Sequence, residues 1–135
     1  MGLAEKRGIE DFKTNVFPAL QKNISDAAKF PVTIEVKWET LAADGYADSY
    51  KDFFTKIYFN PLIRTFQSIC RDKMGQDSLK GALKKVLICN ENGNSSYNGF
   101  SFENGVLKLD HRSECNVDDE NERVDGLTKL LEQKL

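Results

Sequence analysis

The chain has 135 residues, of which 40% are hydrophobic and 30% are charged, and its formal net charge at pH 7 is −2. This length and composition are typical of one globular domain and exclude a disordered or fibrous protein. Because the charges nearly balance, no overall field draws the chain to nucleic acid or to an anionic membrane, and neither is expected as a partner.

The cellular compartment is predicted from the apolar runs and the cysteines. No apolar run approaches the roughly 20 residues that cross a bilayer, and the first residues lack the apolar segment of a secretion signal. The three cysteines, Cys70, Cys89 and Cys115, are odd in number and form no CxxC pair, so neither a disulfide framework nor a zinc ribbon is indicated. We therefore expect a cytoplasmic protein without a cofactor.

Helical periodicity opens the chain, followed by a strand. Apolar side chains in the first thirty residues recur every three or four positions, which predicts one helix face. Pro18 interrupts this face, so the helix either kinks there or restarts after Asn15. Residues 32–38 alternate apolar and polar side chains, which predicts a strand with one wet face.

The segment from Ala43 to Lys85 returns to helical spacing. Asn60 and Pro61 predict a boundary between two helices, with Asn60 as the N-cap and Pro61 at the first helical position. Gly75 is expected to end the second of these helices, and a third, short helix is expected from about Asp77.

The last third of the chain predicts three strands and a helix. Residues 86–90 are apolar at the positions of both strand faces, which indicates either a strand covered on both faces or one that runs directly out of the helix before it. Residues 97–103 and 106–111 flank Asn104-Gly105, the strongest short signal for a two-residue hairpin turn. Glu103 should then pair with Val106 across this turn. An amphipathic helix should follow from Asn116 onward, and the helix dipole favours the acidic residues at its start.

These elements predict an α+β fold over residues 1–135, in the order α-β-α-α-α-β-β-β-α. We expect an antiparallel sheet of about four strands, made of the early strand and a three-stranded meander, with helices mainly on one face.

His111 and Cys115 are the first candidates for chemistry. His111 is the only histidine, and an imidazole and a thiol four residues apart at a strand end can form a catalytic pair or contribute two metal ligands. The other interpretation is that His111 ends an inward-facing row and Cys115 fills space. This second interpretation is favoured, because no complete ligand set accompanies the pair and no metal is expected.

Aromatic residues between positions 46 and 59 are the second candidate. They are too many for one helix face, so they either form a thick core, which the helical spacing of most of them favours, or line a pocket or partner surface. The accessible candidates would be Tyr46, Tyr50, Phe54 and Tyr58.

Two classes of function remain open. The first is a non-catalytic module that binds a protein partner or a small apolar ligand through the aromatic 46–59 region. The alternative is an enzyme or metal-binding protein that uses His111 and Cys115. Helix faces that pair in a homodimer are a third possibility.

Overall fold

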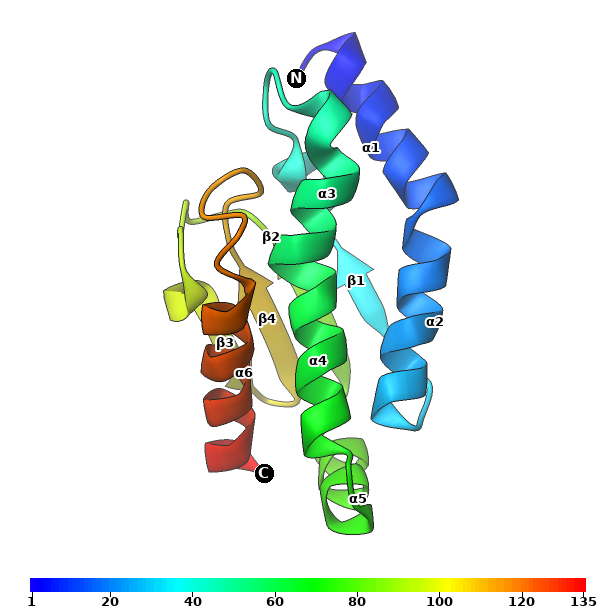
Figure 1. Ribbon diagram of the computed structural model, residues 1–135, viewed down its shortest axis with the longest axis vertical. Coiled ribbons are helices and arrows are strands. Elements are labelled where there is room, and N and C mark those ends of the chain that lie inside the picture. Colours follow the sequence, from blue (N-terminus) through cyan, green and yellow to red (C-terminus); the bar gives the residue numbers. More distant parts are fainter.

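A four-stranded sheet with helices packed on one face forms the frame of the protein, as the computed structural model of residues 1–135 describes it. Figure 1 shows α2, the α3–α4 rod and α6 side by side across the sheet. The helices are α1 (Leu3–Asn15), α2 (Phe17–Ala28), α3 (Tyr50–Phe54), α4 (Asn60–Ile69), α5 (Lys73–Ala82) and α6 (Glu120–Lys134). The strands are β1 (Ile34–Val36), β2 (Lys85–Cys89), β3 (Phe100–Glu103) and β4 (Val106–Asp110). Three short 3-10 helices, η1 (Trp38–Leu41), η2 (Ala47–Ser49) and η4 (Tyr97–Gly99), and one π-helical turn, η3 (Thr55–Phe59), complete the chain.

The sheet is mixed, and the expectation of an antiparallel meander is wrong. Its order is β1-β2-β4-β3, with β1 parallel to β2, β2 parallel to β4, and only β3 antiparallel to β4. Parallel neighbours need a long crossover, and the helices between β1 and β2 supply one. The β3–β4 hairpin then turns so that β4 pairs with β2 and leaves β3 at the edge.

The hairpin itself forms as predicted. Glu103 pairs with Val106 and Phe102 with Leu107, across a turn in which Asn104 has a φ of 53° and Gly105 a φ of 80°. Both turn residues thus adopt the left-handed conformation that the two-residue turn requires. The α+β class and the register of this hairpin are confirmed.

The N-terminal helical segment is broken between α1 and α2, so of the two expected alternatives, a kink or a restart after Asn15, the structure shows the restart. Val16 joins the two helices, and Pro18 lies in the first turn of α2, where its missing N–H costs nothing. The following strand is shorter than predicted, because the chain turns into the helix η1 at Trp38.

The predicted boundary at Asn60-Pro61 is wrong, because α3, η3 and α4 form one continuous rod. Asn60 has helical dihedral angles and caps nothing; its backbone N–H donates to the carbonyl of Thr55, the i→i−5 bond of a π turn. A π turn widens the helix by one residue, and this accommodates Pro61 without a break.

Gly75 lies within the first turn of α5, so the expectation that it ends the preceding helix is also wrong. Its N–H donates to the side chain of Asp72, the N-cap of α5, at 2.8 Å. A Cβ on Gly75 would lie 1.7 Å from the carbonyl oxygen of Ile69. The glycine therefore permits a tight corner between α4 and α5.

One hydrophobic core lies between the helices and the sheet. In β2, Val86 and Ile88 point into it, while Lys85 and Leu87 are only half-buried on the opposite side. Of the two expected alternatives, cover on both faces is therefore wrong, and a strand that runs directly out of the preceding helix is found, since α5 ends at Ala82 and β2 begins at Lys85. None of the helices combines the length and the apolar character needed to cross a membrane.

Candidate functional site

The aromatic residues of the 46–59 region lie mostly in the core. Tyr50, Phe54 and Tyr58 are buried, and only Tyr46 is exposed, at 43%. The hydroxyl of Tyr50 donates to the carbonyl of Ala43 at 3.1 Å and accepts from its N–H at 3.0 Å. Three of the four candidate residues thus hold the helices together instead of lining a surface.

His111 is fully buried directly after β4. Its backbone N–H donates to the carbonyl of Cys89 at 3.0 Å, and Nδ1 of its ring lies 2.6 Å from the carbonyl oxygen of Arg112. Its Nε2 has no hydrogen-bond partner. Burial lowers the pKa of the imidazole, and the hydrogen bond to the Arg112 carbonyl opposes this shift only in part. The buried ring is therefore held neutral.

Cys115 makes contacts different from those of His111. It is half-buried, and its Sγ lies 3.6 Å from Oε1 of Glu114. Partial burial and the Glu114 carboxylate raise the pKa of this thiol, which is the opposite of what an activated nucleophile needs. No group of three or more His, Cys, Asp or Glu side chains is placed to hold a metal ion.

Arg123 is buried in the first turns of α6, and the sequence patterns did not single it out. Its guanidinium donates to the carbonyls of Asn116 at 2.7 Å, Val117 at 2.7 Å and Lys56 at 3.1 Å. Lys56 belongs to the π turn. Arg123 thus joins the start of α6, the preceding loop and the central rod.

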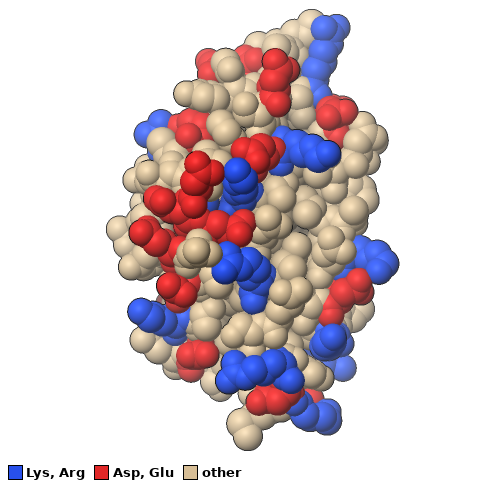
Figure 2. Space-filling view, viewed as in Figure 1, with Lys and Arg blue, Asp and Glu red and all other residues tan.

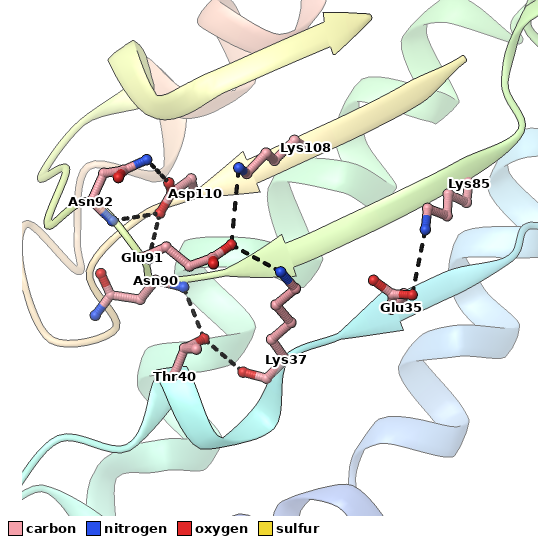
Figure 3. Close-up of polar contacts among 9 residues, drawn as sticks. All are labelled: Glu35, Lys37, Thr40, Lys85, Asn90, Glu91, Asn92, Lys108 and Asp110. Atoms are coloured by element: carbon pink, nitrogen blue, oxygen red, sulfur yellow. Dashed lines mark hydrogen bonds and ion pairs between the residues drawn. The ribbon is translucent and has the colours of Figure 1, made fainter. Parts of the chain in front are cut away.

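The carboxyl ends of β1, β2 and β4 meet at one edge of the sheet, the edge at which open α/β sheets bind ligands. Figure 3 shows the polar contacts there. The carboxylate of Asp110 accepts from the N–H of Glu91 at 2.8 Å and from the side-chain amide of Asn92 at 2.6 Å. The hydroxyl of Thr40 accepts from the N–H of Asn90 at 3.0 Å. These groups bind the chain's own loops and thereby fix their conformation.

Charged side chains also cross the open face of the sheet (Figure 3). Lys85 lies 3.4 Å from Glu35, while Lys37 and Lys108 approach Glu91 to 3.2 Å and 3.9 Å. Each pair is partly exposed, and such pairs contribute little to stability. Because these charges lie in partly exposed ion pairs, this face has the character of a solvated surface.

A groove between α6 and the segment 97–100 differs from both of these regions. Its volume is about 610 Å³. Tyr97 and Phe100 line one wall, and Glu122, Asp125 and Leu130 line the wall formed by α6. Tyr97 is 46% exposed, whereas Phe100 is buried beneath the surface. The groove therefore combines an accessible aromatic ring with charged and apolar groups.

Gly126 makes this arrangement possible. A Cβ on Gly126 would lie 2.6 Å from Cγ of Tyr97, so the tyrosine ring sits directly on the helix backbone. Glycine in a helix interior costs about 0.5–1 kcal/mol relative to alanine. A mid-helix glycine was the one signal in the sequence that could have pointed to a close packing partner on α6.

Acidic side chains gather over α6 and the loop before it, as Figure 2 shows. Several are paired within the chain: Glu120 with Arg64 at 3.0 Å and Asp118 with Lys56 at 3.2 Å. Glu122 and Asp125, which line the groove, form no ion pair. The groove thus carries two carboxylates without an ion-pair partner, together with Lys129.

Comparison with protein-family models, curated proteins and solved structures gives no match to this chain.

Proposed function

We propose that this protein is a non-catalytic module that binds a protein partner in the groove between α6 and the segment 97–100. The observation that carries the proposal is the seating of exposed Tyr97 on Gly126, beside two carboxylates without ion-pair partners. Exposed tyrosine is enriched at protein interfaces because it gives a large contact area at low entropic cost.

The form of the groove favours a protein segment over a small apolar ligand. Sites for small ligands are concave and mostly apolar, whereas this groove is open and lined by carboxylates, amides and a lysine. Along α6 it extends from Glu122 to Gln133, which corresponds to roughly 16 Å of helix at 1.5 Å per residue. An extended peptide segment matches that length.

The aromatic 46–59 region contributes indirectly to this function. Tyr58 and Phe59 pack in the core at the centre of the rod, against which α6 lies. They thereby fix the position of the helix that forms one wall of the groove.

The three cysteines form no disulfide, which supports a reducing compartment such as the cytoplasm.

Photo-crosslinking from the groove tests the proposal. The photoreactive residue p-benzoylphenylalanine would replace exposed Asn98 in the groove wall, and, as a control, exposed Met74 on α5. Irradiation in a lysate of the protein's own source should give a discrete crosslinked protein from position 98 alone. Excess wild-type chain should compete for it, whereas the Tyr97→Ala variant should not.

Two outcomes would contradict the proposal. One is the same set of crosslinked products from positions 98 and 74, which would indicate nonspecific contact. The other is competition by Tyr97→Ala as strong as that by the wild-type chain, which would show that the partner does not depend on the groove.

A further inference from the structure

We infer that the groove binds the side chain of an arginine in a basic segment of the partner, between Tyr97 and the carboxylates of Glu122 and Asp125. This inference rests on the proposed function and adds the chemical class of the partner.

Charge complementarity is the first argument. Three acidic residues of the segment 114–125 have a basic partner in the chain: Glu114 pairs with Arg112, Asp118 with Lys56 and Glu120 with Arg64. Asp119, which lies outside the groove, and the two carboxylates that line the groove have none. A cation supplied by another molecule would compensate the two groove carboxylates, which suit the planar, multiply donating guanidinium of arginine.

The aromatic ring is the second argument. Tyr97 exposes almost half of its surface in the same groove, and a cation over a tyrosine ring is attracted by the negative face of the ring. A guanidinium can stack on this ring and still donate hydrogen bonds to a carboxylate, which a compact ammonium does less well.

The remainder of the groove accounts for the rest of an arginine side chain and for its direction. Half-buried Leu130 provides apolar surface for the methylene stem. Lys129 lies one helical turn beyond Asp125, lines the same groove and forms no ion pair. It repels a cation at its own end, so the guanidinium is directed toward the end formed by Glu122 and Asp125.

A pair of matched peptides tests this inference on the intact protein. One is a short peptide, acetylated and amidated, with a single arginine between two leucines; in the other, citrulline replaces the arginine and removes only its charge. Binding would be followed by ¹H–¹⁵N NMR titration. The amides of Tyr97, Asp125 and Gly126 should shift, and the arginine peptide should bind about tenfold more tightly than the citrulline peptide.

Charge variants and ionic strength separate the contribution of charge from nonspecific binding. The double variant Glu122→Gln, Asp125→Asn should reduce the affinity for the arginine peptide to the citrulline level. Glu132→Gln removes an exposed charge from α6 outside the groove and should leave the affinity unchanged. Raised ionic strength should weaken binding of the arginine peptide only.

Equal affinity for the two peptides, no saturable shift at the groove with the arginine peptide, or full binding by the double variant would overturn the inference. If a crosslink from position 98 still depends on Tyr97 in that case, the proposed function stands and only the class of partner is wrong. If the crosslink also fails, both are wrong.

Discussion

The hydroxyl of Tyr58 donates a hydrogen bond to the backbone carbonyl of His111, and the rings of these two buried residues meet edge to face with their centroids 6.4 Å apart. Tyr58 lies in the π turn of the central rod, and His111 follows the last residue of β4. The contact therefore joins the helical layer to the carboxyl end of β4. Burial raises the pKa of Tyr58 well above its usual value, so this donor keeps its proton at every physiological pH.

His111 should make the stability of the protein depend on pH. Because the folded state lowers the pKa of the imidazole below its usual 6.5, the unfolded chain binds a proton first as the pH falls. The contribution of the neutral ring is fully present above about pH 6.5 and is lost as the pH falls from there through the folded-state pKa. Denaturant unfolding at a series of pH values would measure this loss.

The variant His111→Phe removes the titrating group and keeps a ring in the same space. Between pH 7 and pH 5, its free energy of unfolding should fall less steeply than that of the wild type, by at most the slope for one proton, about 1.4 kcal/mol per pH unit. Parallel pH profiles for the two proteins would show that His111 does not titrate differently in the folded and unfolded states.

Arg123→Met should be strongly destabilising. It leaves the carbonyls of Lys56, Asn116 and Val117 without their donor in the interior, and we expect a loss of about 3 kcal/mol in the free energy of unfolding. The control is Arg71→Met, which removes an exposed guanidinium that donates to the carbonyl of Ser68 and should cost at most about 0.5 kcal/mol. Similar losses in the free energy of unfolding for the two variants would mean that the buried guanidinium contributes no more to stability than the exposed one.

Local signals in the sequence were sufficient for several elements. Asn104-Gly105 predicts the hairpin and its register because the turn geometry depends on those two residues alone. Pro18 likewise predicts an interruption of the N-terminal helical segment, although it does not decide between a kink and a restart. The order of the sheet, by contrast, depends on which distant strands pair, and β4 pairs with both β2 and β3 although only β3 is its neighbour in sequence.

The candidate site could be predicted only in part for the same reason. Helical spacing favoured a core role for the 46–59 aromatics, and the burial of Tyr50, Phe54 and Tyr58 agrees with it. No periodicity links Tyr97 to Gly126, because the β3–β4 hairpin and the loop before α6 separate them. Pro61 misled the helix assignment because a π turn compensates for it, and π turns leave no local sequence signal of their own.

Thiol labelling tests the alternative hypothesis of a reactive Cys115. Burial raises the pKa of Cys70, burial together with Glu91 raises that of Cys89 to about 12, and burial with Glu114 raises that of Cys115. At neutral pH all three should react with iodoacetamide more slowly than a cysteine in a short peptide, with half-buried Cys115 first. Mass spectrometry against time would show the order. Alkylation of Cys115 faster than the peptide thiol would instead support an enzyme that uses this residue.

Gly126→Ala and Gly81→Ala form a matched pair of helix substitutions with opposite expected outcomes. Both glycines lie in helices, and a Cβ at Gly81 would meet nothing within 4 Å, whereas one at Gly126 would lie 2.6 Å from the Tyr97 ring. Gly81→Ala should stabilise the protein by about 0.5 kcal/mol. Gly126→Ala should destabilise it by about 1 kcal/mol or more, because the clash exceeds the gain in helix propensity.

The double variant Tyr97→Ala, Gly126→Ala identifies the cause of that loss. Removing the ring relieves the contacts with Cγ and Cδ2 but leaves one of 2.9 Å with the Cβ of residue 97, so the added methyl group should destabilise less than it does in the presence of the ring. Thermal unfolding of the four proteins of this cycle gives the coupling free energy directly. A coupling near zero would mean that Tyr97 does not sit on Gly126 in solution, and the groove would then lose the aromatic wall on which the binding proposal depends.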